Sequence, residues 1–296
     1  MSLLWVVPKA AFLSYVGNLR YSRGHFCLDS LTYLPLLCLL GALAGLMAGL
    51  FGIGGGLVTV PGLYLFLSFI GVPASTAMSL AVGSSLAAIV PTSISSLNAH
   101  RQLGNVDWES AKLVVLPLVG GVIIGSQLII VMDGRLLALL FGCMSWTIAW
   151  KVSLAPKPKP SKWFARAWVK AVSAALIGLV SVMAGVGGGA FAAPLFMAGG
   201  LAIHRAVGTA SFFGICISFP GVISLLLAGE TPKDAPVGTL SLFYLPGLIA
   251  VALLATLFAP VGARLGKRLS ELSLRRFFAV FLVLVGLRMF WTALSG

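Results

Sequence analysis

The stretch from Leu31 to Ala99 contains no aspartate, glutamate, lysine or arginine. A transmembrane helix needs about 20 apolar residues, so this stretch alone is long enough for several membrane spans. Over the whole chain only 9% of the residues are charged, compared with about 25% in soluble domains, and the mean hydropathy is +1.06. A soluble fold of this composition would aggregate. The sequence therefore predicts an all-α polytopic membrane protein.

Two glycine-rich segments occur at equivalent positions in the two halves of the chain. Gly52-Ile53-Gly54-Gly55-Gly56 is followed by Pro61, and Gly185-Val186-Gly187-Gly188-Gly189 is followed by Pro194. Corresponding residues of the two segments are 133 positions apart. Each glycine lowers helix propensity by about 1 kcal/mol relative to alanine, so three consecutive glycines favour a break in a helix. We therefore expect broken helices at both segments.

A second pair of motifs supports a two-fold repeat. Ala81-Val82-Gly83-Ser84 corresponds to Ala206-Val207-Gly208-Thr209, 125 positions later, and transporters are commonly built from such repeats. The predicted organisation is an N-terminal extension over residues 1–32, a first transmembrane repeat over 33–150, a basic linker rich in proline and lysine over 151–170, and a second transmembrane repeat over 171–296. Ten apolar segments are expected at Tyr33–Leu50, Leu57–Ile70, Ser75–Asn98, Ser110–Met132, Leu136–Trp150, Ala171–Ala184, Ala190–Ala202, Ala206–Ala228, Leu240–Val261 and Leu274–Ala293.

The number of membrane crossings decides how the two repeats are related. Five crossings per repeat make the repeats inverted, whereas re-entrant glycine hairpins with four crossings per repeat make them parallel. The inverted arrangement places 14 of the 20 lysines and arginines in the cytoplasm and the parallel one places 13, so the count hardly separates them. Only inversion keeps the basic residues from Arg264 to Arg276 cytoplasmic, and we favour it. The length of the segment Leu57–Ile70 is an argument against inversion. Its 14 residues form about 21 Å of helix, which is too short to cross a hydrocarbon core about 30 Å thick.

Helices that begin at the two glycine triplets would direct unpaired backbone N–H groups, and the positive ends of their dipoles, toward the middle of the membrane. Such helix starts bind anions, and glycine lets a ligand approach the backbone closely. Hydroxyl side chains follow on the next segments, including the run from Thr92 to Ser96, and they could also bind the anion. Alternatively, each hydroxyl bonds the backbone carbonyl four residues earlier in its own helix. The predicted substrate-binding residues are Gly54, Gly55, Gly56, Ser84, Ser85, Gly187, Gly188, Gly189, Thr209 and Ser211.

The chain has no pattern typical of a metal site or a catalytic centre. Its three histidines, His25, His100 and His204, lack metal-ligand spacing, so we expect no metal, no cofactor and no enzymatic activity. The apolar segments of the first half contain no carboxylate for a proton relay or sodium site, although backbone carbonyls could still hold a cation. Two interpretations fit the pairs His100-Arg101 and His204-Arg205. Together they could form a cytoplasmic mouth that attracts anions. The more ordinary interpretation is that the two histidines face solvent or lipid headgroups.

Several of these motifs together resemble the sulfite exporter TauE/SafE family of bacterial inner-membrane permeases. They are the two glycine segments, Ala-Val-Gly-Ser-Ser at 81–85, His100 with Gly-Asn-Val-Asp-Trp at 104–108, and Ala-Val-Gly-Thr-Ala at 206–210. The resemblance covers about Tyr33 to Thr292. It implies movement of sulfite or C2 and C3 organosulfonates, usually outward. Where the family pattern commonly reads Gly-Thr-Ser, this chain has Gly-Ser-Ser and Gly-Thr-Ala, so the second motif lacks one hydroxyl.

The function predicted from the sequence is that of a secondary transporter of the inner membrane, working by alternating access on a small sulfur-containing anion. The alternatives are a permease for another small anion or a metal cation, and a membrane scaffold without transport. The net charge of +13 comes from short loops, so the expected partners are the substrate anion and the lipid bilayer rather than nucleic acid. Substrate identity, direction, coupling ion and assembly into a homo-oligomer stay open.

Overall fold

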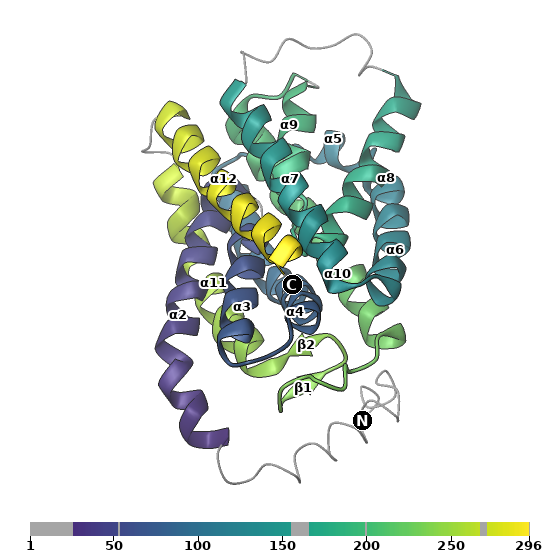
Figure 1. The fold of residues 1–296 in the computed structure, drawn as a ribbon. Coiled ribbons are helices and arrows are strands. Elements are labelled where there is room, and N and C mark those ends of the chain that lie inside the picture. The colour runs from purple at the N-terminus through teal and green to yellow at the C-terminus, as the bar shows by residue number, and fades with distance from the viewer. Residues whose placement is uncertain (1–25, 53, 155–165, 199, 267–270, 296) are drawn as a thin grey trace, which may run out of the picture.

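The structure is a computed structural model that describes the chain apart from residues 1–25, 53, 155–165, 199, 267–270 and 296. The expectations for the N-terminal extension and for the proline-rich centre of the linker fall mostly outside these described residues. Helices dominate the rest (Figure 1). They are α2 (Phe26–Phe51), α3 (Gly56–Phe69), α4 (Ala74–Gln102), α5 (Trp108–Lys112), α6 (Val115–Val131), α7 (Gly134–Leu154), α8 (Ala167–Met183), α9 (Gly189–Ala198), α10 (Ile203–Ala228), α11 (Leu245–Gly266) and α12 (Glu271–Ser295), with a two-stranded hairpin of β1 (Thr239–Leu240) and β2 (Phe243–Tyr244).

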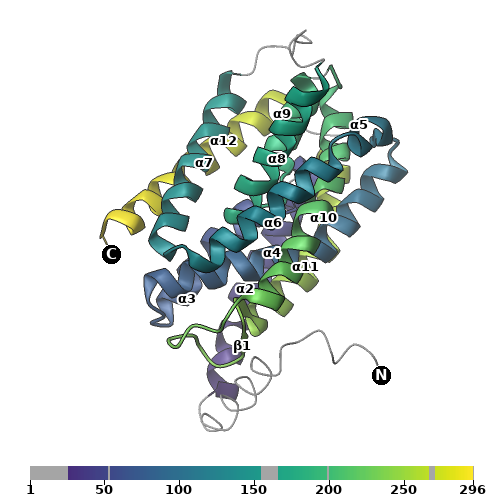
Figure 2. The ribbon, with the colours of Figure 1, turned by 90° about the vertical axis from the view of Figure 1, so that its right-hand side faces the viewer.

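The helices pack as a bundle with α4 and α10 at its centre. These two helices contact each other, and α3 and α9 pack against α4 and α10, respectively. Around them, α2 pairs with α11, α8 with α6, and α7 with α12 (Figures 1 and 2). Each central helix also contacts outer helices: α4 packs mainly against α11 and also against α7 and α2, and α10 packs mainly against α6 and also against α8. The interior is one apolar cluster to which all of these helices contribute.

The bundle has two ends that can be told apart in both views. At one end lie β1, β2 and the start of α2; we call it the hairpin end (Figures 1 and 2). At the other lie α5, the end of α7 and the start of α8; we call it the α5 end. The short helix α3 lies toward the hairpin end and the short helix α9 toward the α5 end. The two short helices therefore extend from the middle of the bundle in opposite directions.

Small residues allow the outer helix pairs to approach closely. A Cβ built on Gly41 would lie 2.8 Å from the carbonyl oxygen of Val251, and one on Gly45 would lie 2.7 Å from the Cα of Ala255. The pair α6 and α8 is built in the same way, because a Cβ on Gly125 would lie 2.7 Å from the carbonyl oxygen of Leu179. Close approach through glycine and alanine is typical of helices that pack inside a membrane, where van der Waals contact drives association.

The lengths and composition of the helices fit a multi-pass membrane protein. Among the described residues, four helices are long and apolar enough to cross a membrane: Tyr33–Phe51, Ala74–Gln102, His204–Ala228 and Leu245–Gly266. Shorter apolar helices accompany them. Large apolar side chains are exposed on the outside of the bundle, among them Leu116 at 84% and Leu253 at 59%, as expected where lipid takes the place of water. The all-α membrane class is therefore confirmed.

Most expected segments coincide with helices, but the last-but-one begins later than predicted. We expected an apolar segment from Leu240, whereas α11 begins at Leu245 because residues 239–244 form the β1–β2 hairpin. Thr239 pairs with Tyr244 and Leu240 with Phe243, and the turn between them contains Ser241 at φ 53°. A residue in the left-handed region breaks a helix, so the apolar composition of this stretch was misleading.

Candidate substrate site

The first glycine segment separates α2 from α3. Gly52, Gly54 and Gly55 have φ values of 67°, 68° and 83°, a region that other L-residues rarely adopt. Gly55 is the residue before the first turn of α3, and its carbonyl oxygen accepts hydrogen bonds from the N–H groups of Val58 and Thr59, both at 3.0 Å. The backbone path between the two helices therefore depends on glycine.

The second glycine segment makes a similar turn between α8 and α9, although Gly187, unlike its counterpart Gly54, does not have a positive φ. Gly185 and Gly188 have φ values of 64° and 69°. The carbonyl oxygen of Gly188 accepts hydrogen bonds from the N–H groups of Phe191 at 3.0 Å and Ala192 at 2.8 Å. These residues lie 133 positions after those that hold the first turn. The matching spacing seen in the sequence thus corresponds to matching hydrogen bonds.

The start of α3 leaves backbone donors available. Among the hydrogen bonds of the described residues, none has the N–H of Gly54, Gly55 or Gly56 as its donor. In the second segment the N–H of Gly189 is bonded to the carbonyl oxygen of Gly187 at 2.8 Å, while that of Gly188 donates to no described group. Unpaired amides at a helix start carry partial positive charge, so each segment offers donors suited to an anion.

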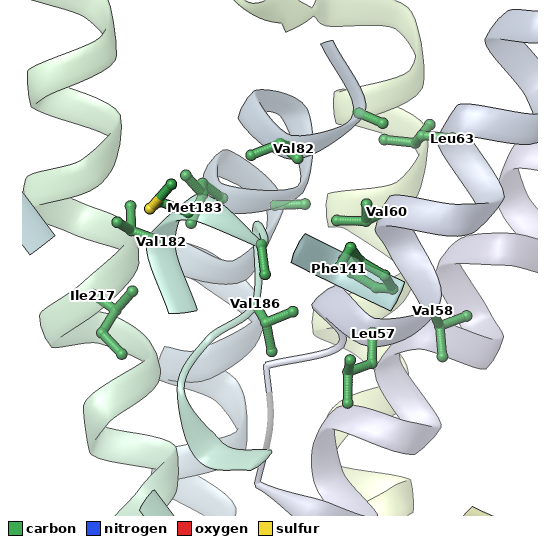
Figure 3. Packing of buried hydrophobic residues seen from close by; sticks show 14 of the residues in the cluster. Leu57, Val58, Val60, Leu63, Val82, Phe141, Val182, Met183, Val186 and Ile217 are labelled. Carbon is green, nitrogen blue, oxygen red and sulfur yellow. The ribbon is translucent and has the colours of Figure 1, made fainter. Parts of the chain in front are cut away.

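The two glycine segments touch each other in the middle of the bundle. A Cβ on Gly56 would overlap the carbonyl oxygen of Gly185 and lie 2.8 Å from the Cα of Val186. A Cβ on Gly185 would lie 2.9 Å from the side chain of Val60 on α3, and Figure 3 shows Val186, Leu57 and Val60 in the same group of buried side chains. The hydroxyl of Ser85 on α4 donates to the same Gly185 carbonyl at 2.7 Å. Two of the predicted site residues, Gly56 and Ser85, therefore meet at Gly185.

Ser84 on α4 holds the β1–β2 hairpin in place. Its hydroxyl, which is fully buried, accepts a hydrogen bond from the backbone N–H of Tyr244 at 2.8 Å. The preceding residue, Gly83, lies so close to the carbonyl oxygen of Leu242 that an added Cβ would overlap it. We call this contact the Ser84 lock. It joins the first half of the chain to the second at the hairpin end.

Thr209 on α10 makes the equivalent contact at the α5 end. Its hydroxyl accepts from the backbone N–H of Asp107 at 2.9 Å and donates to the carbonyl oxygen of Arg205 at 2.7 Å. A Cβ on the preceding Gly208 would overlap the carbonyl oxygen of Asn105. We call this contact the Thr209 lock. The hydroxyls of Ser84 and Thr209, which were predicted to bind substrate, thus bond backbone groups of the opposite half of the chain.

The remaining predicted residues lie toward the α5 end, in different surroundings. The hydroxyl of Ser211 lies 3.2 Å from that of Ser96. The expectation that His100 faces solvent or lipid headgroups is wrong. His100 is only 5% exposed, on α4, and its Nε2 donates to the carbonyl oxygen of Gly49 at 3.0 Å. Arg101 and His204 are exposed. Arg205 forms an ion pair with Asp107, with Nη2 3.5 Å from Oδ2.

Two serines beside the glycine segments were not among the predicted site residues. Ser93 on α4 and Ser181 on α8 are fully buried, and their hydroxyls have no hydrogen-bond partner among the described residues. Ser93 belongs to the hydroxyl-rich run noted in the sequence, whereas Ser181 carried no signal beyond its position four residues before Gly185.

A cavity of about 390 Å³ opens at the hairpin end. Leu242 is part of its wall, and the carbonyl of Leu242 faces Gly83 in the Ser84 lock. The cavity therefore reaches the outer side of that lock. Polar and charged residues of its lining are Ser75, Thr76, Ser79, Asp133 and Glu230. Among the residues that the structure describes, no group of three or more His, Cys, Asp or Glu side chains could hold a metal ion.

The fold and the site together define a multi-pass α-helical membrane protein with backbone amides and hydroxyls at its two glycine segments. Residues 37–289 match the family described as Sulfite exporter TauE/SafE, and the chain belongs to that family. It is 35% identical to a probable membrane transporter protein of Haemophilus influenzae, over 88% of this chain and 98% of the relative. A probable membrane transporter protein of Methanocaldococcus jannaschii is 27% identical over 88% of this chain and 97% of the relative. No solved structure matches the chain.

Family and relatives confirm the resemblance inferred from the motifs, and they identify the chain as a membrane transporter.

Proposed function

We propose that this chain is a secondary transporter of the bacterial inner membrane that exports small sulfur-containing anions, such as sulfite or C2 and C3 organosulfonates. The anion binds between the two glycine segments, and alternating access carries it across. The observation that carries the proposal is the meeting of two glycine turns in the middle of an apolar bundle, each with N–H groups that no described residue accepts. Preformed backbone donors of this kind suit an oxyanion. The family description, Sulfite exporter TauE/SafE, supports the same substrate class.

The proposal includes two inverted repeats with a helix break at each glycine segment. The helix contacts support it, because exchanging α2, α3, α4, α6 and α7 for α8, α9, α10, α11 and α12 maps the main packing pairs onto one another, although the contact of α4 with α7 has no comparable contact of α10 with α12 in the part of the chain that the structure describes. The pair α2 with α11 becomes α8 with α6, and the pairs α4 with α10 and α7 with α12 map onto themselves. Inversion is supported by direction, since α2 begins at the hairpin end and α8 at the α5 end (Figure 1). Inverted repeats around a central site are a common transporter design.

The two locks provide the parts that alternating access requires. Each joins a loop of one proposed repeat to a central helix of the other, and they lie at opposite ends of the bundle. Opening the Ser84 lock would connect the centre to the cavity at the hairpin end, whereas opening the Thr209 lock would connect it to the α5 end. Transport follows if only one lock is open at a time.

Charge distribution supports a cytoplasmic α5 end. Arg135, in the first turn of α7, and Lys233, in the loop before β1, lie toward the hairpin end, close in sequence to Asp133, Glu230 and Asp234. Cytoplasmic loops carry an excess of lysine and arginine, so the end with more basic residues is expected to be cytoplasmic. The membrane potential, which is negative inside, drives an anion outward by about 2.3 kcal/mol per charge per 100 mV. Export therefore needs no coupling ion. Basic residues on elements at the α5 end include Arg101, Lys112, Lys151, Arg166, Lys170, Arg205 and Arg264.

The test is flux of sulfite, sulfoacetate and thiosulfate from proteoliposomes at imposed zero and inside-negative potentials, with pH clamped. We expect flux of at least one anion that increases with potential. Gly55→Leu and Gly188→Leu should abolish it, because both positions have positive φ and close neighbours. Gly120→Leu is the matched control, since an added Cβ there meets nothing within 4 Å.

Two outcomes would contradict the proposal. Normal flux by folded Gly55→Leu and Gly188→Leu proteins would rule out the central site. Absence of flux for all three anions would exclude sulfur-anion export and leave a permease for another anion or a metal cation, or a scaffold. Turnover of a lipid or peptide by the purified protein would contradict the expectation that it is not an enzyme.

A further inference from the structure

Two buried serine hydroxyls at the glycine segments have no partner among the described residues. Ser93 and Ser181 are each 0% exposed, and neither Oγ atom forms a hydrogen bond in that part of the chain. A buried hydroxyl without a partner is costly, because it has given up its bonds to water and gained nothing in exchange. Such a group in a native protein needs an explanation, and beside other unpaired donors a bound ligand supplies one.

Ser93 lies between the two glycine segments. A Cβ built on Gly54 of the first segment would be 2.9 Å from the Ser93 Oγ. A Cβ built on Gly214 of α10 would overlap the same Oγ and lie 3.5 Å from the carbonyl oxygen of Gly187 in the second segment. The hydroxyl of Ser93 therefore faces the backbone of the first segment and lies close to that of the second.

Ser181 lies beside the second segment, in the last turn of α8. Its carbonyl oxygen accepts the N–H of Val186 at 2.9 Å, which ties α8 to the glycine turn. Its Oγ would be 3.7 Å from a Cβ built on Gly188, the residue whose carbonyl begins α9. The hydroxyl thus borders the same turn whose N–H at Gly188 is unpaired among the described residues.

Neighbouring hydroxyls on the central helices are satisfied within the helix. Thr92 donates to the carbonyl oxygen of Ala88, and Ser218 donates to that of Gly214, each at 2.7 Å. Ser218 is the counterpart of Ser93, 125 positions later. Ser68 on α3 and Ser145 on α7 also lack a partner among the described residues, so what distinguishes Ser93 and Ser181 is that they border the glycine turns, where backbone N–H groups are unpaired as well.

We infer that Ser93 and Ser181 donate their hydroxyl hydrogens to the transported anion and complete the site formed by the unpaired amides of the two glycine segments. The inference rests on the proposed function and specifies its ligand. The donors come from four different segments, α4, α8 and the two turns, so the site suits an anion with several oxygens on one central atom, such as sulfite or a terminal sulfonate. Ser93 contributes more, because it lies between both segments.

The experiment compares alanine variants in proteoliposomes containing the full chain, with sodium sulfite as the probe. Ser93→Ala should raise the KM for sulfite about ten-fold, the factor that corresponds to one lost hydrogen bond to a charged group, and Ser181→Ala about three-fold. Neither variant should lower the Tm of the ligand-free protein, since each removes a hydroxyl that no described group pairs with. Addition of sulfite should raise the Tm of the wild type more than that of either variant.

Two controls separate binding from packing. Ser145→Ala on α7 removes another fully buried hydroxyl that has no partner in the described part of the chain, far along the sequence from either turn. Ser218→Ala removes the counterpart of Ser93. Both should leave the KM unchanged. If Ser93→Ala does not elute as a folded protein, Ser93→Cys replaces the hydroxyl by a weak donor at similar volume and should give the same rise in KM.

Each result decides between the inference and the proposed function. Sulfite flux by the wild type with an unchanged KM in both Ser93→Ala and Ser181→Ala overturns the inference and leaves the proposed function intact. A rise in KM equally large for Ser145→Ala also overturns it. Absence of flux for sulfite, sulfoacetate and thiosulfate in the wild type overturns the proposed function, and the inference with it.

Discussion

The Ser84 lock and the Thr209 lock use the same bond at opposite ends of the bundle, but their surroundings differ. In both, a hydroxyl on a central helix accepts a backbone N–H from the other half of the chain, and the glycine before it lies against a carbonyl oxygen. Of the two, the Thr209 lock adds an ion pair, between Asp107 and Arg205. The Ser84 lock instead borders the cavity of about 390 Å³.

This comparison indicates which parts of the locks matter energetically. The ion pair is partly in contact with solvent, with 53% of the Arg205 side chain exposed, and exposed pairs contribute about 0–1 kcal/mol. A buried N–H that loses its acceptor costs about 1–3 kcal/mol. The shared hydroxyl bond should therefore dominate both locks, and the ion pair should only adjust the balance between them.

The largest effect is expected from filling the close contacts in the locks. Gly83→Ala and Gly208→Ala each place a Cβ onto a backbone carbonyl oxygen, which cannot move aside as a side chain can. Overpacking of this kind destabilises by about 1–3 kcal/mol, and we expect values at the upper end together with loss of flux. Thermal unfolding of the purified protein measures the effect, and Gly120→Ala is the control. If both variants are as stable as the wild type, the carbonyl oxygens of Leu242 and Asn105 do not lie close against these two glycines, and the account of the locks is contradicted.

A smaller effect is expected from removing the hydroxyls themselves. Ser84→Ala and Thr209→Ala leave the N–H of Tyr244 or Asp107 without its acceptor. Each should destabilise the closed lock by about 2 kcal/mol, within the usual range for an unpaired buried donor. Thr209→Ser keeps the hydroxyl and should behave as wild type. Hydrogen exchange at the N–H groups of Tyr244 and Asp107 reports each lock separately, and unchanged protection of both would contradict the account.

The smallest effect is expected from the ion pair. Asp107→Asn removes the charge that faces Arg205 but keeps a side-chain oxygen that can accept the N–H of Ser110, as Asp107 does at 3.2 Å. We expect a loss below about 1 kcal/mol that disappears at high salt, because screening weakens the pair in the wild type as well. Hydrogen exchange of the backbone N–H at position 107, measured in wild type and variant at low and high ionic strength, tests this. A salt-independent loss would mean that the charge acts in another way.

Much of the fold could be predicted from the sequence because apolar length and glycine spacing are local signals. The short helix predicted over Leu57–Ile70 is observed as α3, one residue earlier at each end. The start of α11 could not be predicted, because residues 239–244 are mainly apolar and their hairpin depends on the turn at Ser241. Composition does not reveal whether an apolar stretch continues a helix or folds back on itself.

The site was predictable only where both halves carry the same motif. Recurrence drew attention to Ser84 and Thr209, but not to the loops that their hydroxyls hold, which come from the other half of the chain. Ser93 and Ser96 look alike in the sequence, yet Ser96 contacts Ser211 whereas Ser93 lacks a partner among the described residues. Both serines lie against α10, Ser93 at Gly214 and Ser96 at Ser211, so the difference depends on which residue of α10 each one meets, and a single sequence does not contain this information.

The most direct test of the two-lock account is the reactivity of matched cysteines at the two ends. Ala81 and Ala206 occupy equivalent positions two residues before Gly83 and Gly208, and both are 0% exposed. Ala81→Cys and Ala206→Cys would be introduced singly into a chain whose native cysteines are replaced by alanine, and labelled in detergent with a polar thiol reagent. Thr209→Ala should speed labelling of Ala206→Cys and slow that of Ala81→Cys, and Ser84→Ala should do the reverse. Faster labelling of both cysteines in either variant, or no change in either, would contradict alternating opening.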